Sequence, residues 1–182
     1  SREKRSVVYQ RAKNVLDTSP FGTRQNVYQS GYDWVAHSLE PQHPEPSTAR
    51  VLIGAKLSPQ PYSASLFTVS AMSYGSLSRN AASALNRGAR LGEFFHNTGE
   101  GGVSPHHLSP GGDLVWQVGT GYFGCRSSDG GFDAALFAAV AQDERIKMIE
   151  VKLSQGAKPG HGGILPGKKV TLEVAAIRGV PV

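Results

Sequence analysis

Cysteine is almost absent from this 182-residue chain, in which Cys125 is the only one. A single cysteine excludes an intrachain disulfide, and it cannot build an iron–sulfur cluster or a structural zinc site from this chain alone. No adjacent base marks Cys125 as a nucleophile, so we expect a small buried apolar residue there. Such cysteine usage fits a reducing compartment, and we predict a cytoplasmic protein.

Long apolar runs are also missing. None approaches the roughly 18 residues that span a bilayer, and the charged start of the chain has no apolar signal-peptide stretch. We therefore expect no membrane partner for this chain. The chain also starts without Met, which suggests a cut or processed product.

Clustered basic residues with interleaved aromatics are absent as well. The net charge is +5, but the basic residues are densest in the first 13 positions and are otherwise dispersed. This distribution argues against a specific nucleic-acid partner and favours a small anionic substrate. No metal site is expected either, because the histidines lack the spacing of known ligand sets. These histidines are His96, His106, His107 and His161.

Apolar runs followed by glycine-rich segments dominate the second part of the chain. Strand, glycine-rich opening and helix in alternation are typical of α/β proteins with a parallel sheet. Ligands bind at the carboxyl ends of such strands, so we expect the site there. The predicted strands are 66–72, 94–97, 114–118 and 148–152, and the predicted helices are 79–91, 133–142 and 170–178, with Ser78 as an N-cap and Gly179 as a C-cap.

Residues 1–65 have a different character. The spacing of apolar residues predicts a helix over 2–17 and a short packed segment over 28–39. Three prolines in the stretch 40–46 exclude a helix or a central strand there and indicate an extended linker. A short strand is predicted over 50–54.

The sequence leaves two interpretations open both for residues 97–102 and for Lys152. Residues 97–102 (NTGEGG) form either a backbone nest that presents Glu100 or a flexible turn with a solvated glutamate. Lys152, at the end of a predicted strand, either stabilises an anionic cofactor or substrate, or pairs with Glu150 or reaches solvent. The pattern Gly119-x-Gly121-x-x-Gly124 matches a dinucleotide motif, but no helix begins at Gly124, which argues against such a site.

Four motifs in this order resemble the synthase domain of the FMN-binding glutamate synthase family. They are AMSYG at 71–75, NTGEGG at 97–102, GTGYFG at 119–124 and IEVKLSQGAKPGHGG at 149–163. Stand-alone members of that family are the most similar, since their first segment resembles residues 1–65. The resemblance covers nearly the whole chain, and its last motif is long and specific.

The resemblance implies a (β/α)8 TIM barrel with FMN at the carboxyl ends of the strands. Its reaction reduces 2-iminoglutarate, made from 2-oxoglutarate and ammonia, to L-glutamate, with electrons from a donor protein or domain. On this view residues 1–65 are an extension and linker, and 66–182 are the first half of the FMN-binding barrel. The alternatives are a related FMN barrel acting on another amine, as in methylamine–glutamate transfer, or an inactive structural half-barrel.

The resemblance also implies roles for single residues. Glu100 and Lys152 are the expected catalytic residues, and Glu100 matches the glutamate that links the ammonia route to the synthase site. Met72 and Ser73 match backbone contacts to the isoalloxazine ring of the flavin, and Lys152 matches a cation near the flavin N1 and C2 carbonyl. The residues expected around the carboxylates of 2-oxoglutarate are Gln155, Lys158 and Arg178.

Three departures from the family qualify this expectation. About 117 residues follow position 65, whereas a full barrel needs roughly 250, so about four βα units are present. The cysteine motif for an iron–sulfur cluster and the amidotransferase domain are absent from this chain. A half-barrel has an unpaired strand at each edge, so we predict pairing with a second copy or with the missing half.

Overall fold

The computed structural model describes residues 2–15, 26–34, 36, 38–45, 49–154 and 165–182. The chain divides into two compact units, Ser1–His43 and Pro44–Val182. Among the described residues, no helix is both long and apolar enough to cross a bilayer. The predicted division at residue 65 concerns the start of the barrel and stays a prediction.

The first unit contains one described helix, α1 (Arg2–Ala12). This helix is shorter than the predicted range 2–17. Asn14 takes a left-handed φ of 51°, and the amide of Val15 donates to the carbonyl of Gln10 at 2.9 Å, which closes the last turn. The predicted packed segment is wrong at Trp34, which contacts Tyr32 edge-on but stays 70% exposed.

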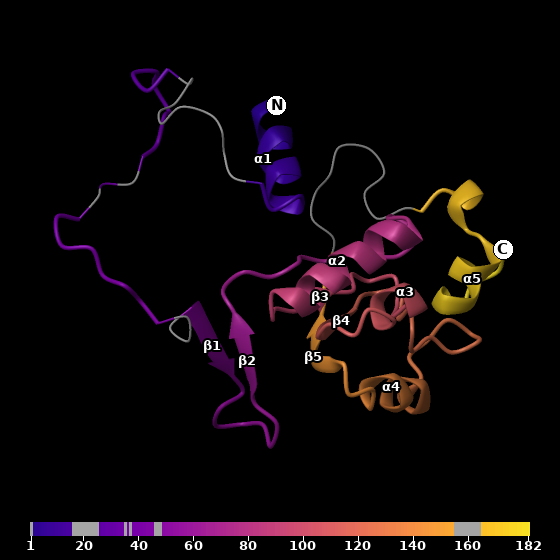
Figure 1. The fold of residues 1–182 in the computed structure, drawn as a ribbon. Helices are drawn as coiled ribbons and strands as arrows, with labels where there is room; N and C mark the ends of the chain where they lie inside the picture. Colours follow the sequence, from indigo (N-terminus) through magenta and orange to yellow (C-terminus); the bar gives the residue numbers. More distant parts are fainter. Residues whose placement is uncertain (1, 16–25, 35, 37, 46–48, 155–164) are drawn as a thin grey trace. The chain divides into compact units, whose positions relative to one another are not determined.

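The second unit is mixed α/β, and its centre is a three-stranded parallel sheet in the order β3-β4-β5 (Figure 1). Neighbouring strands are consecutive in the sequence, and their parallel direction is the one that the alternating pattern predicted. The three strands are β3 (His96–Asn97), β4 (Leu114–Val118) and β5 (Ile146–Val151).

The predicted strand 66–72 is not a regular strand. It makes one parallel bridge, between Val69 and His96, and the amide of Met72 donates to the carbonyl of Asn97 at 3.1 Å. The segment therefore lies beside β3 as the next position in the sheet.

The helices agree closely with the sequence pattern. Helix α2 has the predicted bounds, and its N-cap Ser78 accepts from the amide of Ala81 at 3.3 Å. Gly179 ends α5 with a left-handed φ of 64°, as expected for a C-cap glycine. The helices are α2 (Arg79–Leu91), α3 (Pro105–Leu108), α4 (Ala134–Ala141) and α5 (Leu172–Arg178), with a 3-10 turn η2 (Gly167–Lys169).

The buried face of α2 differs from the expected one. The spacing of small and apolar residues in this helix indicates a buried face of Ala81, Ala84, Leu85, Gly88 and Ala89, whereas the buried residues are Ala82, Asn86 and Ala89. Asn86 is buried because its amide group bonds both main-chain groups of Gly112, before β4. A polar residue that is satisfied in this way is invisible to a hydrophobic pattern.

The core between the sheet and α4 is small and aromatic. Trp116 and Val118 of β4 pack with Cys125, and Phe137 of α4 lies with its ring centroid 5.3 Å from that of Trp116. Cys125 is fully buried, as expected for a small apolar residue, and burial raises the pKa of its thiol. The face of β4 that carries Trp116 and Val118 therefore faces α4.

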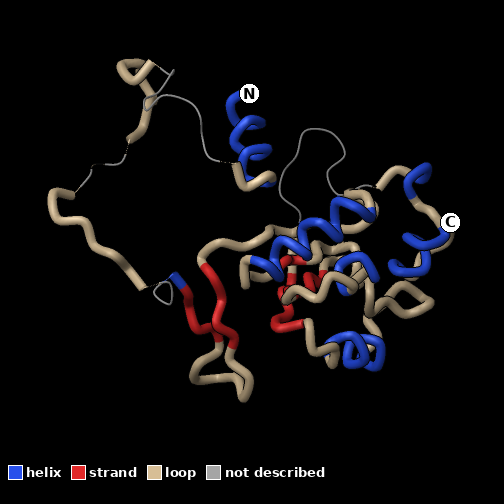
Figure 2. Tube along the Cα trace, viewed as in Figure 1, coloured by secondary structure: helices blue, strands red, loops and turns tan. Residues whose placement is uncertain are grey.

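A β-hairpin precedes the sheet, and only its first strand was predicted. It consists of β1 (Arg50–Ile53) and β2 (Tyr62–Ser65), joined by the loop drawn in tan (Figure 2). Pro61 directly precedes β2, a position where proline is tolerated.

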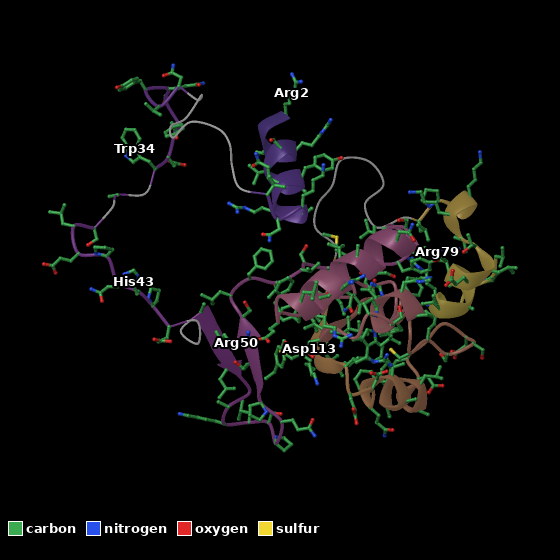
Figure 3. All side chains as sticks on the ribbon, viewed as in Figure 1. Arg2, Trp34, His43, Arg50, Arg79 and Asp113 are labelled. Carbon is green, nitrogen blue, oxygen red and sulfur yellow. The ribbon has the colours of Figure 1, made fainter. Side chains whose placement is uncertain are left out.

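Two hydrogen bonds connect the hairpin with the sheet. Arg50 donates to the carbonyl of Glu93 at 2.9 Å, and Tyr62 donates to Asp113 at 2.8 Å. Figure 3 labels Arg50 and Asp113. Glu93 and Asp113 precede β3 and β4, so the hairpin is bonded at the amino ends of the strands, opposite the expected site.

Candidate functional site

The carboxyl ends of β3 and β5 bring an acid and a base together. The Lys152 ammonium lies 3.1 Å from Oε1 of Glu100, and the two side chains are 29% and 26% exposed. The residues are 52 positions apart, so the parallel sheet alone makes them neighbours. Lys152 therefore pairs with Glu100, whereas the pairing that the sequence analysis named was with Glu150.

Gly119, at the end of β4, makes room for this pair. A Cβ atom at this position would lie 2.5 Å from Oε2 of Glu100 and 2.9 Å from its Cβ. Gly124, in turn, has a φ of 96° and approaches the ring of Trp116. The glycine pattern thus serves close packing, and α4 begins only at Ala134, which agrees with the absence of a dinucleotide-type helix start.

The segment 97–102 is a bonded loop. The side-chain oxygen of Asn97 accepts from the amide of Gly99 at 2.9 Å. Thr98 donates from its hydroxyl to the carbonyl of Gly99 at 2.9 Å and accepts from the amide of Gln117 at 3.1 Å. With Thr98 fully buried and Glu100 paired, the interpretation as a flexible turn with a solvated glutamate is wrong.

Met72 and Ser73 lie against this loop. The carbonyl of Met72 accepts from Nε2 of His107 at 2.9 Å, and its amide is bonded to Asn97. A Cβ at Gly99 would lie 2.8 Å from the amide nitrogen of Ser73, so glycine is needed there for close approach. Both main-chain polar groups of Met72 are therefore engaged within the protein.

His107 and Ser104 were not singled out by the sequence patterns as a functional pair. Ser104 caps α3, and Nδ1 of His107 accepts from its amide at 3.2 Å. Burial lowers the pKa of His107, so the ring is neutral, with its proton on Nε2 toward Met72. The dipeptide Ser104-Pro105 was the available signal, since serine at an N-cap and proline at the next position favour a helix start.

Arg178 approaches the same loop from α5. It is 9% exposed, and its guanidinium donates to the carbonyl of Tyr74 at 3.3 Å and lies 5.0 Å from the ring centre of Phe123. Burial lowers the pKa of Arg178, against the opposing effect of Glu100. Its Nε is buried without a hydrogen-bond partner among the described residues. Arg178 thus has a donor to spare near Glu100.

The other expected substrate residues, Gln155 and Lys158, lie outside the described residues. Within the described part of the chain, no cluster of three or more His, Cys, Asp or Glu residues could hold a metal ion. His96 and His107 lie with ring centroids 5.2 Å apart. Burial, and secondarily the nearby His107, lower the pKa of His96 to about 4.

Comparison with known proteins relates the chain to one group. Curated relatives include a glutamate synthase large subunit-like protein, YerD, of Bacillus subtilis, 48% identical over 112 residues, or 61% of this chain and 21% of the relative. An archaeal-type glutamate synthase [NADPH] of Thermotoga maritima is 44% identical over 112 residues, covering 62% of this chain and 20% of the relative.

The chain spans only about a fifth of the length of these relatives. An archaeal glutamate synthase [NADPH] of Methanocaldococcus jannaschii is 41% identical over 111 residues, 60% of this chain and 19% of that protein. No solved structure matched the chain. The model of the conserved region in glutamate synthase matches residues 28–182. The chain therefore belongs to the glutamate synthase family.

Proposed function

We propose that this chain supplies the first strand ends of the active site of an FMN-dependent glutamate synthase-type oxidoreductase. The reaction is the reduction of 2-iminoglutarate, formed from 2-oxoglutarate and ammonia, to L-glutamate. The observation that carries the proposal is the Glu100–Lys152 ion pair at the carboxyl ends of parallel strands, with Arg178 against the neighbouring Gly101. Family membership supplies the reaction class.

The strand order supports a (β/α)8 barrel as the architecture. The segment at Val69, β3, β4 and β5 are neighbours in the order of the sequence and run parallel. A doubly wound sheet reverses its order at a switch point, where its ligand binds, whereas a barrel adds each strand beside the last. Four consecutive positions without a reversal favour the barrel.

The residues at the strand ends have the chemistry that FMN requires. When bound, FMN supplies the hydride that reduces the imine. Its reduced form carries negative charge, which a cation fixed in a partly buried site stabilises. Lys152 is such a cation, and Ser73 lies against the same loop as Glu100. Since the main chain of Met72 is already engaged, we assign a flavin contact there to its side chain.

The remaining side chains are assigned to substrate binding and to proton transfer. The Arg178 guanidinium, which lies against Gly101, is assigned to a carboxylate of 2-oxoglutarate, with Gln155 and Lys158 as further candidates. Glu100 is suited to hold ammonia through its carboxylate before it attacks the carbonyl carbon of 2-oxoglutarate. The Glu100 carboxylate can accept a proton that ammonia loses, and the carbonyl oxygen leaves as water when the imine forms.

The test is a chimera. The 112 matched residues of the Thermotoga maritima glutamate synthase are replaced by those of this chain, and L-glutamate formed from 2-oxoglutarate, ammonia and NADPH is measured. We expect activity, and we expect Lys152→Met to lower kcat by about 100-fold, the usual effect of removing a stabilising charge. A chimera that is folded and loaded with FMN but forms no glutamate would overturn the proposal.

Lys147→Met is the matched control. Lys147 lies on the same strand at its amino end, 3.9 Å from Asp113, and its loss should leave kcat within about threefold, as for a surface ion pair. Methylamine offered in place of ammonia tests the other amine chemistry. If N-methylglutamate forms faster than glutamate, the methylamine–glutamate alternative replaces the proposed reaction.

A further inference from the structure

Glu150 accepts hydrogen bonds from two neighbouring strands. Its Oε1 accepts from the side-chain amide of Asn97 on β3 at 3.1 Å and from that of Gln117 on β4. Gln117 and Glu150 face each other in the strand register. These three side chains therefore form one polar row across the sheet.

This row lies on the same face of the sheet as Lys152. Side chains alternate between the two faces of a strand, so Glu150 and Lys152 share one face of β5. Trp116 and Val118 of β4 lie on the opposite face, which packs against α4. The row therefore lies next to the Glu100–Lys152 pair on this face, two residues nearer the amino end of β5.

An ionised carboxylate only accepts hydrogen bonds, and this fixes how Asn97 is oriented. The NH2 group of Asn97 must face Glu150, so its carbonyl oxygen faces away. That oxygen accepts from the amide of Gly99 at 2.9 Å. The residue after Gly99 is Glu100, whose carboxylate bonds Lys152 at 3.1 Å.

We propose that Glu150 is a positioning residue for the catalytic pair. By orienting the Asn97 amide it holds Gly99, and through Gly99 it holds the Glu100 carboxylate against Lys152. We call this series of contacts, from Glu150 through Asn97, Gly99 and Glu100 to Lys152, the circuit. It starts on β5 and returns to the residue just after β5. The catalytic consequence rests on the proposed function, whereas the structural circuit does not.

The test reverses the direction of one hydrogen bond. Asn97→Asp alone sets two carboxylates against each other, so the introduced carboxylate turns away and the Gly99 amide loses its acceptor. Asn97→Asp with Glu150→Gln restores the circuit. The introduced glutamine NH2 group donates to one oxygen of the introduced carboxylate, whose other oxygen accepts from Gly99. The Gln117 amide flips, so that its oxygen faces the same NH2 group. Glu150→Gln alone preserves the acceptor oxygen and should change little.

Amide hydrogen exchange of Gly99, followed by NMR on the 182-residue chain, is the readout. We expect its exchange to accelerate at least about tenfold in Asn97→Asp and to return to within about threefold of wild type in the double variant. Amides of α2 should stay unchanged, which separates positioning from general destabilisation. Unchanged Gly99 exchange in Asn97→Asp, or no recovery in the double variant, overturns the proposal.

Glu150→Ala keeps the test decisive if Asn97→Asp does not fold. Glu150 is exposed, so its truncation is tolerated, and the freed Asn97 amide can flip, which accelerates Gly99 exchange. Glu144→Ala, at another exposed glutamate just before β5, is the control and should have no effect. If Glu150→Ala leaves Gly99 exchange unchanged, the positioning role is wrong.

This readout needs neither FMN nor turnover, so it stands even if the proposed reaction fails. In an active chimera, Asn97→Asp should lower kcat while KM for 2-oxoglutarate stays within about twofold, because the substrate carboxylates are assigned elsewhere. A rise in KM with unchanged kcat would contradict the link between the circuit and the catalytic pair.

Discussion

A methyl group added at Gly119 would overlap the carboxylate of Glu100, 2.5 Å away. Gly119→Ala should therefore displace Glu100 from Lys152 and lower kcat of the chimera at least about tenfold, since small misplacements of catalytic groups are costly. Gly88→Ala, where nothing lies within 4 Å of the added atom, is the control. Equal kcat values in the two variants would show that Glu100 needs no such space.

His96 makes stability depend on pH. It is fully buried, and its pKa in the folded chain is about 4, against 6.5 for an ordinary histidine. Between these values the unfolded chain binds the proton more tightly, so stability present above pH 6.5 is lost as the pH falls toward 4. The loss amounts to about 3 kcal/mol at about 1.36 kcal/mol per pKa unit.

Urea unfolding at about pH 7, above this window, and at about pH 4.5, near its lower end, measures the effect. We expect His96→Leu to lose distinctly less stability between the two pH values than wild type. His43→Gln, at an exposed histidine, should keep the wild-type pH dependence. A wild-type dependence in His96→Leu would assign the acid sensitivity to other groups.

At the scale of elements, α2 is attached to the segment before β4 by close backbone approach. A Cβ at Gly112 would lie 2.6 Å from the carbonyl oxygen of Asn86, so Gly112→Ala forces the two segments apart. We expect it to cost about 2–4 kcal/mol of unfolding free energy, as for strained core substitutions. Thermal and urea unfolding would measure the change.

Gly88→Ala in the same helix should have the opposite sign. Gly88 lies within α2, and a methyl group added there would have no heavy atom within 4 Å. Alanine is favoured over glycine inside a helix by about 1 kcal/mol, so the variant should be more stable. If both variants were destabilised alike, the close approach at Gly112 would not explain the cost there.

Helix α5 is attached at both of its ends. Near its start, Glu173 accepts from the hydroxyl of Tyr74 at 2.6 Å and bonds His106 of α3 at 2.8 Å. At its end, Arg178 donates to the carbonyl of Tyr74. The hydrogen bond to Glu173 raises the pKa of Tyr74. These contacts hold α5 where Arg178 reaches the Glu100 loop.

At the scale of the whole molecule, β5 is an edge of the described sheet with exposed apolar residues. Val151 is 65% exposed, and Leu153 just beyond it is 85% exposed. We predict that the purified chain associates through this edge with a second copy. Light scattering should find a dimer or larger assembly, and Val151→Lys should shift it toward monomer. A wild-type monomer at about 100 μM would contradict the prediction.

The proposed flavin site would extend over the whole barrel. A barrel usually holds the cofactor phosphate after strands seven and eight, and the sequence analysis predicts only about four βα units here. We therefore expect the isolated chain to bind FMN weakly, with a Kd above about 10 μM. Titration followed by flavin fluorescence measures this. A purified chain that retains a visible flavin spectrum would be the contrary result.

Much of the fold was predictable because its signals are local. Helix α2, strand β4 and the caps Ser78 and Gly179 appeared where capping and short apolar runs indicated. The predicted strand 66–72 and the second hairpin strand β2 were not recovered correctly, because edge segments depend on partners far along the chain.

The sequence by itself was sufficient to identify the family, through four motifs that contain glycines at fixed positions. Its four ordered motifs are chemical patterns that need no partner to be recognised, and the family model confirms them over residues 28–182. It also predicted that Glu100, Lys152 and Arg178 belong to one site. Their individual roles stay predictions.

Only the tertiary structure decided which charges meet. Spacing left Lys152 with several possible environments, and the parallel register of β3, β4 and β5 brings Glu100 to it. The same register sets Glu150 beside Asn97, 53 positions away. The packing of α3 places His107 against the carbonyl of Met72. Contacts between residues so far apart in the sequence depend on how strands and helices pack, and a local sequence pattern cannot predict that packing.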